Sequence, residues 1–469
     1  MISVETVEAE TRPVSGQLGE FAARLRSEDI PAAVRSRARY LILDAVGCAL
    51  AAKRFEFASR SLEGIAALAG PGERAVIGHA LRLPLRDAAL ANGILAHGLD
   101  YDDTHSEGVV HLTVSAFPTA LGVAAQCDAP LRDLLAAYIV ALEAGARIAA
   151  VARGGFHRAG FHPTGLVGAF GCALAAGRLY GLDATQLAHA QGIALSTASG
   201  SLEFLEDGAW TKRFHPGWAA VGGIVAAALA RHGFVGPHAA YEGRFGLYAS
   251  HLGPSAADCD YSRASARLGT AWETLNVALK PFPACHLAHA FADAAIALRG
   301  AGLDPAEVDR VTTLVPEQIV PIVCEPAAGK RRPASHYDAQ FSLPYIVAAS
   351  LVRGKFGLAE LDQAALSDPQ VLALAAKVGY EADPRSGFPR HYSGELVVRT
   401  ADGRERRHRE QVNRGSADRP LADAEISEKF MRNAACAVTQ QRAYEIQEAV
   451  LRLPDDSSAR ELERVLGEA

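Results

Sequence analysis

The chain has 469 residues, of which 49% are hydrophobic and 21% are charged, and this composition excludes an intrinsically disordered protein. Its length predicts two or three domains with a substantial core. The formal net charge of −6 provides no overall positive field, so nucleic acid and anionic membranes are not expected partners.

We find no segment in the sequence that we expect to direct export. Residues 1–13 are rich in glutamate and lack the basic start and apolar run of a signal peptide. Residues 218–230 form the longest apolar stretch, shorter than the ~20 residues that cross a bilayer, and are predicted to be a buried helix. The seven cysteines are scattered without a C-x-x-C pair, which argues against disulfide frameworks and zinc modules. We therefore expect a cytoplasmic protein that is not bound to a membrane.

Helices with short connections are predicted from residue 15 to about residue 270. One begins after Ser27, where a capping serine precedes a proline of the first turn. Another covers residues 165–177, where small residues at three- and four-residue spacing allow close helix packing. A nucleotide-binding loop is the alternative for its glycines, but no strand precedes them and no Lys-Ser or Lys-Thr follows. This part of the sequence therefore has no NAD or ATP fingerprint.

Strands are predicted only after about residue 270. The β-branched runs 308–315 and 319–323 are typical of strands. Residues 395–400 and 404–412 flank Asp402-Gly403, a strong hairpin signal. The second of these segments is rich in arginine, and its interruption by glutamates indicates a solvated sheet edge rather than a nucleic-acid site.

Helices are predicted between and after these strands, at residues 285–299 and at residues 338–353, where Gly354 would end the helix. Helical periodicity returns from residue 422, so the C-terminus is expected to pack on the first domain. The predicted fold is mainly α. It has a large all-helical domain, residues 1–274 and 415–469, and a smaller α+β domain, residues 275–414.

The segment from His97 to His111 concentrates acids and imidazoles. It contains Asp100, Asp102, Asp103, Thr104 and His105 between its two ends. The acids and histidines could be ligands of a metal ion. They could also be a solvated helix end, or an active-site wall in which Asp100 orients an imidazole and His111 transfers a proton. Spacing alone leaves the three interpretations open.

Two further segments place cations or imidazoles beside helix starts. His162 precedes the helix of small residues, where exposed amide groups attract carboxylates, although an isolated histidine there is more often a cap. Lys212 and Arg213 lie in a polar, aromatic-flanked turn before the apolar helix. A partly desolvated lysine there could hold a carboxylate or exchange protons, whereas the default is a solvated loop lysine.

Lys280 also precedes a helix, from which a stiff Pro-x-Pro loop separates it. His286 and His289 share one face of that helix, and Asp293 is one turn beyond, where it could orient His289. Cys285 at the helix start could be a thiolate, but a small buried cysteine is the more common case.

Five segments together resemble one family, the 2-methylcitrate dehydratase (MmgE/PrpD) family. They are NGILAHGLDYDDTH, GFHPTGLVGAF, AWTKRFHPGWAAVGGIVAAALARHGF, LKPFPACHLAHAFADAA and DAQFSLPYIVAASLVRGKFG, in the family's order. The resemblance implies a large helical domain with a smaller α+β lid, a homodimer, and a reaction without metal or organic cofactor. It thereby favours the acid–base interpretation of residues 97–111.

The resemblance also implies which residues form the site. Catalytic roles are expected of Asp100, His111, His162, Lys212 and Lys280. Substrate contacts are expected of Asp103, Thr104, Cys285, His286 and Tyr345. Relatives often have His-Pro-Ser where this chain has His111-Leu-Thr, so the role of His111 most needs testing.

The implied function is that of a lyase of the 2-methylcitrate dehydratase type, which removes water from a small di- or tricarboxylate by proton transfer next to a carboxylate. Decarboxylation of the cis-aconitate type and epimerisation of the iminodisuccinate type are alternatives on the same scaffold, and a catalytically silent dimer is the non-enzyme alternative. In the predicted mechanism, Asp100 orients His111, while the two lysines and His162 clamp the carboxylates.

Overall fold

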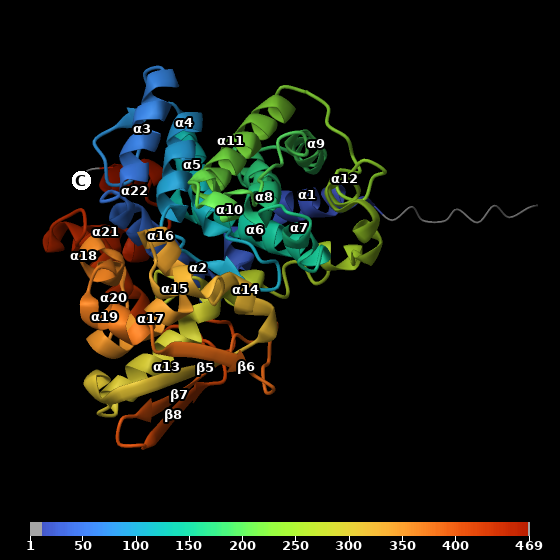
Figure 1. The fold of residues 1–469 in the computed structure, drawn as a ribbon. Helices are drawn as coiled ribbons and strands as arrows, with labels where there is room; N and C mark the ends of the chain where they lie inside the picture. Colours follow the sequence, from blue (N-terminus) through green and yellow to red (C-terminus); the bar gives the residue numbers. More distant parts are fainter. Residues whose placement is uncertain (1–11, 468–469) are drawn as a thin grey trace, which may run out of the picture.

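A computed structural model describes residues 12–467 of the chain. The glutamate-rich beginning that argues against a signal peptide lies largely outside these residues. The described chain is mainly helical, with its larger sheet confined to a smaller domain (Figure 1), which confirms the predicted fold class.

The first part of the chain forms the helical domain. Short two-stranded sheets accompany its helices, and one of them joins β3 to β4, with Thr104 opposite Ala278. The elements are α1 (Val14–Arg24), α2 (Ala32–Ala52), α3 (Glu56–Leu68), β1 (Arg74–Ala75), β2 (Arg82–Leu83), α4 (Leu85–His97), β3 (Thr104–His105), α5 (Thr113–Cys127), α6 (Leu131–Val151), α7 (Gly155–Arg158), α8 (Pro163–Leu179), α9 (Ala184–Ala194), α10 (Phe204–Asp207), α11 (Thr211–Arg231), α12 (Leu247–Leu252) and β4 (Val277–Ala278).

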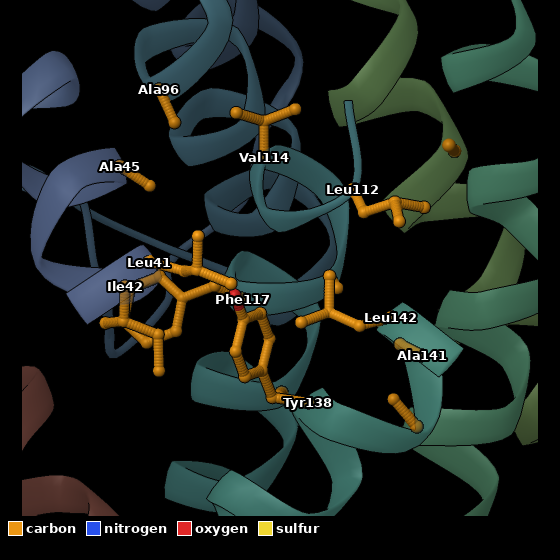
Figure 2. Close-up of a cluster of buried hydrophobic side chains, with 14 of the residues drawn as sticks. Leu41, Ile42, Ala45, Ala96, Leu112, Val114, Phe117, Tyr138, Ala141 and Leu142 are labelled. Atoms are coloured by element: carbon orange, nitrogen blue, oxygen red, sulfur yellow. The ribbon is translucent and has the colours of Figure 1, made fainter. Parts of the chain in front are cut away.

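The core of this domain lies where α2, α4, α5 and α6 meet. Phe117 of α5 and Tyr138 of α6 pack edge to face at its centre, among aliphatic side chains (Figure 2). Helix α6 is long and apolar enough to cross a membrane, but its most apolar window is entirely buried inside the protein, as in the core helix of a globular domain. The small residues of α8 let it approach closely. A Cβ on Gly171, for example, would lie 2.8 Å from the backbone oxygen of Ala141 in α6.

Helix α11 is longer and less buried than the sequence predicts. It begins at Thr211, so that Lys212 lies in its first turn, and it includes Pro216. One face packs on α8 and α4. The other face leaves Trp218 39% exposed and Leu229 38% exposed. The prediction of a buried helix over residues 218–230 is therefore wrong for this second face.

A second hydrophobic core belongs to the lid, whose buried residues lie between Phe282 and Val398. Helices α13 and α17 pack against a four-stranded sheet of order β6-β5-β7-β8, in which only β5 and β6 are parallel. The lid elements are α13 (His289–Gly300), β5 (Val308–Val315), α14 (Val320–Val323), α15 (Ala327–Arg331), α16 (His336–Gln340), α17 (Leu343–Arg353), α18 (Gln363–Leu366), α19 (Pro369–Ala375), β6 (Val378–Ala382), β7 (Gly394–Thr400) and β8 (Glu405–Glu410).

The structure confirms the strand at 308–315 and the hairpin around Asp402-Gly403, but not all of the lid predictions. Residues 319–323 are helical, because Pro316 and Pro321 stand at helix starts, where proline is well tolerated. The helix expected at 338–353 is two helices, since Ser342 caps a new start by accepting a hydrogen bond from the amide of Tyr345. Gly354 ends α17 with a φ of 67°, as predicted.

Asp293 does not orient His289. Its carboxylate accepts a 2.9 Å hydrogen bond from Arg414, while His289 Nε2 donates to the backbone oxygen of Ala284 at 3.0 Å. Both residues of α13 therefore stabilise the lid and its junction with the C-terminal segment.

The C-terminal helices return to the helical domain, where α20 and α21 lie beside α2 and α22 packs on α5 (Figure 1). Ile426, Phe430, Ile446 and Leu466 are buried in the core of that domain. The helices are α20 (Asp423–Ala434), α21 (Gln440–Arg452) and α22 (Ala459–Gly467).

Candidate active site

The loop that follows α4, residues 98–103, is fixed by side chains from several parts of the chain. Asp100 has a left-handed backbone conformation with φ of 49°, which is unfavourable for a residue other than glycine. Four consecutive carbonyl oxygens of this loop each accept a 2.7 Å hydrogen bond from a different side chain. The pairs are Gly98 with Arg213 Nε, Leu99 with Gln340 Nε2, Asp100 with Lys280 Nζ, and Tyr101 with Lys429 Nζ. The helical domain, the lid and α20 thus hold the loop together.

Two lysines hold the carboxylate of Asp100 between them. Lys212 Nζ lies 2.7 Å from Oδ2, and Lys280 Nζ lies 2.7 Å from Oδ1. Pairing of β3 with β4 brings the segment before Lys280 to the loop. Burial opposes the ionisation of Asp100, but the two ammonium groups outweigh it and hold the pKa of this carboxyl well below its usual value. The two lysines therefore form a cationic centre around one buried carboxylate of the protein itself.

His111 lies beside Asp100 and turns one ring nitrogen toward it. Its Nδ1 is 2.6 Å from the backbone oxygen of Asp103 and 3.1 Å from Oδ2 of Asp102. Because both neighbours accept hydrogen bonds, Nδ1 is the donating nitrogen of this ring, and Nε2 is the nitrogen on the side of Asp100. Nε2 is 3.8 Å from Asp100 Oδ1, too far for a hydrogen bond. Asp102, rather than Asp100, therefore orients the ring.

Asp102 also binds a second imidazole, that of His97. Its Oδ1 is 2.9 Å from His97 Nδ1. Burial opposes the ionisation of Asp102, but the two imidazoles outweigh it and lower the pKa of this carboxyl. Burial lowers the pKa of His97 to about 4, so this ring is neutral at pH 7. The site thus contains two imidazoles that share one carboxylate.

His162 completes the cluster as the residue before α8. Its ring stacks on that of His97 with centroids 5.6 Å apart, and its Nδ1 is 3.0 Å from Nδ1 of His215. Burial, followed by the charge of Lys212, holds the pKa of His162 well below its usual value. At neutral pH the ring of His162 is therefore uncharged, and the positive charge of the cluster comes from the lysines.

The residues predicted to contact the substrate do not all lie in this cluster. Thr104 Oγ1 lies 3.4 Å from Nδ1 of His111 and belongs to the site. Asp103 instead accepts a 2.5 Å hydrogen bond from the hydroxyl of Thr113. Tyr345 is fully buried in the lid core, where its hydroxyl donates to the backbone oxygen of Glu360 at 2.6 Å. The structure places Tyr345 outside the cluster.

Cys285 and His286 lie at the edge of the site, with partners in the lid. The amide of Cys285 donates to the backbone oxygen of Gln340 at 2.8 Å, and burial raises the pKa of its thiol. The raised pKa disfavours a thiolate at Cys285. The structure therefore agrees with the other alternative, a neutral and buried cysteine. His286 Nε2 accepts a 2.8 Å hydrogen bond from Asn413, and burial lowers the pKa of this imidazole to about 3.

By distance alone the cluster could hold a metal ion. Ligand atoms of His97, Asp100, Asp102 and His111 lie within 4.8 Å of one another, and His162 forms a similar group with the two histidines. Two features oppose a cation there. The ammonium groups 2.7 Å from Asp100 would repel it, and Asp102 already accepts from both imidazoles. The geometry favours an acid–base site.

Several residues of this arrangement were not among the predicted site residues. Asp102 and His97 were within the segment that the sequence singled out, but nothing in the spacing shows which acid faces an imidazole. Gln340 and Lys429 reach the loop from far along the chain and carry no local signal.

Lys429 supports the loop from a completely buried position. Its Nζ is 2.7 Å from Asp44 of α2 as well as from the oxygen of Tyr101. Lys429→Met should lower the free energy of unfolding by about 3 to 5 kcal/mol, because it leaves the Asp44 carboxylate buried without a partner. Chemical denaturation measures this loss, and the double variant with Asp44→Asn should recover part of it. A single variant within ~1 kcal/mol of the wild type would contradict the argument.

Asp103 should make the stability of the protein depend on pH. Burial, reinforced by the charge of Asp102, raises the pKa of Asp103 to about 7. The native state then holds this proton more tightly than the unfolded chain, so stability should decrease as pH rises from about 4 to about 7. We expect Asp103→Asn to be more stable than the wild type, by a few kcal/mol at most, at pH 8 but not at pH 5. Denaturation at both pH values tests this, and an equal difference at both would contradict it.

Comparison with known proteins finds matches in both parts of the chain. Residues 16–260 match the MmgE/PrpD N-terminal domain, and residues 282–455 match the MmgE/PrpD C-terminal domain. The chain is 27% identical to the cis-aconitate decarboxylase-like protein oryM of Aspergillus oryzae, over 96% of each chain. It is 27% identical to the cis-aconitate decarboxylase of Aspergillus terreus, over 96% of this chain and 95% of the relative. It is 30% identical to the human cis-aconitate decarboxylase, over 76% of this chain and 74% of the relative.

Proposed function

The chain belongs to the MmgE/PrpD family, and we propose that it is a carbon–carbon lyase that decarboxylates a small unsaturated tricarboxylate of the cis-aconitate type, without a metal ion or organic cofactor. The observation that carries the proposal is the convergence of Lys212 and Lys280 on the carboxylate of Asp100, 2.7 Å from each, beside Nε2 of His111. The relatives named above support decarboxylation over the dehydration that the sequence alone suggested.

The lysine pair would stabilise the charge that develops during the reaction. When the bond between the carbon skeleton and the departing carboxylate breaks, carbon dioxide leaves and the electron pair stays on the skeleton. A neighbouring carboxylate conjugated with that carbon takes up the negative charge. Ammonium groups already fixed by Asp100 need little reorganisation to bind it, which is the usual source of large rate enhancements.

His111 would complete the reaction by giving a proton to carbon. The proton leaves Nε2, and the imidazole then regains one from water. The charge of Asp102, 3.1 Å from Nδ1, stabilises the imidazolium form that donates. His162 and Thr104 would orient the substrate by hydrogen bonds. Each group thus has a role that its position and charge state permit.

Product analysis tests the proposal. The purified protein is incubated separately with cis-aconitate, 2-methylcitrate and iminodisuccinate, and each solution is followed by NMR. We expect loss of one carbon from cis-aconitate and incorporation of deuterium from heavy water. Loss of water from 2-methylcitrate alone would favour a dehydratase, inversion of iminodisuccinate alone would favour an epimerase, and no turnover of any acid would favour a silent family member.

We also propose that the chain forms a homodimer through the outer face of α11. Phe214, Trp218, Val225 and Leu229 are 38% to 41% exposed and follow one face of the helix at spacings of four, seven and four residues. Light scattering should give about twice the 49.4 kDa chain mass. The double variant Trp218→Glu/Leu229→Glu should be a monomer, because dimerisation would bury two glutamate charges of each chain in an apolar contact.

Leu68→Glu is the matched control for this experiment. Leu68 is 88% exposed at the end of α3, away from α11 in the sequence, so its replacement should leave the mass unchanged. A monomeric wild type, or a double variant that remains dimeric, would contradict the proposed interface.

A further inference from the structure

Arg213 is a buried cation whose terminal nitrogens are not used by the described part of the chain. The residue is 5% exposed and follows Lys212 in the first turn of α11. Its Nε donates to the backbone oxygen of Gly98 at 2.7 Å. Within residues 12–467, neither Nη1 nor Nη2 has a hydrogen-bond acceptor, although both atoms are buried.

Unpaired polar groups of the lid meet Arg213 across the domain boundary. The guanidinium carbon lies 5.4 Å from the ring centre of Tyr337 and 4.5 Å from that of Phe57. Among the described residues, the buried hydroxyl of Tyr337 has no hydrogen-bond partner, and neither has the buried Nε2 of His336. Both belong to α16, the helix from which Gln340 holds Leu99 of the loop.

A structural role accounts for only part of this arrangement. Stacking on aromatic rings uses the faces of the guanidinium, and the contact to Gly98 uses one of its five N–H groups. Among residues 12–467, the in-plane N–H groups of Nη1 and Nη2 are left buried and unpaired, which is costly for a charged group. A planar anion that accepts two parallel hydrogen bonds would satisfy them, and a carboxylate has this geometry.

Arg213 is linked to the lysine pair both along the chain and through the loop of residues 98–103. Gly98, which Arg213 contacts, is two residues from Asp100, and Lys212 is its neighbour in the chain. We propose that Arg213, assisted by the Tyr337 hydroxyl, forms a second carboxylate subsite, which binds a carboxylate of the substrate other than the one held by Lys212 and Lys280. This inference rests on the proposed function and adds a reason for the preference for polycarboxylates.

Binding of two matched acids tests the subsite. Glutarate has the spacing of the two terminal carboxylates of cis-aconitate, and glutaramate replaces one of them with an amide. Calorimetry on the full-length protein should show that glutarate binds about 10- to 100-fold more tightly, the contribution of charge-assisted hydrogen bonds. In Arg213→Met this ratio should fall to about 1 to 3, because only the second carboxylate loses its partner. Tyr337→Phe should lower the ratio by a smaller factor.

Arg231→Met is the matched control, since Arg231 is the exposed arginine at the other end of α11 and its replacement should preserve the ratio. Thermal unfolding of each variant verifies that it is folded. A purely structural role for Arg213 predicts that Arg213→Met weakens both acids equally, and this unchanged ratio would overturn the subsite alone. Failure of the wild type to bind either acid would overturn the proposed function together with the subsite.

Discussion

Lys280→Met should lower kcat/KM for cis-aconitate about 30- to 1000-fold, which is a loss of ~2 to 4 kcal/mol of transition-state stabilisation. The change removes one of the two ammonium groups that bind Asp100 and also the hydrogen bond to the oxygen of that residue. Lys212→Met should cause a loss of similar size while leaving the loop carbonyls paired, because the Lys212 contact is to the carboxylate. Steady-state kinetics gives kcat/KM for both variants. The difference between the two values shows how much the hydrogen bond of Lys280 to the loop adds to the loss of charge.

Lys355→Met is the control, since Lys355 is an exposed lysine of the lid. It should leave kcat/KM within a factor of about two, because surface substitutions away from a site have small effects. Thermal unfolding shows whether the site variants are folded. Near-normal turnover in both Lys212→Met and Lys280→Met would contradict the role given to the lysine pair.

The fold was predictable wherever local chemistry agrees with tertiary packing. The hairpin at Asp402-Gly403 has a turn that few other sequences can form, and the strand before it is rich in β-branched residues. Residues 319–323 have the same β-branched composition, but the prolines at 316 and 321 favour helix starts, and this outweighed the strand propensity. The exposed face of α11 was missed because composition alone does not show which side of an apolar helix lacks a partner.

The convergence of the main candidate residues was predictable from the sequence, but the contacts between them were not. Asp100, His111, Lys212 and Lys280 do converge, as the resemblance implied. Asp100, which has a positive φ, binds the two lysines, whereas Asp102 binds the imidazoles. Spacing along the chain does not encode this turn. It arises because side chains from three regions bind consecutive loop carbonyls, which is a property of the assembled fold.

Asp102→Asn should lower kcat about 100- to 1000-fold with little change in KM, since general acid–base catalysis contributes on this scale. The substitution removes the charge that stabilises the protonated form of His111, and it leaves the lysine pair in place. Steady-state kinetics at one fixed pH separates kcat from KM, and thermal unfolding shows whether the variant is folded.

Asp103→Asn supplies the matched control, since it makes the same chemical change one residue away. The carboxyl of Asp103 binds Thr113, and its pKa of about 7 keeps it mostly protonated in mildly acidic solution, where asparagine is a close substitute. At pH 6 this variant should keep kcat within about tenfold of the wild type. Equal losses in the two variants at that pH would mean that the loop as a whole, and not the Asp102 charge between His97 and His111, determines the rate.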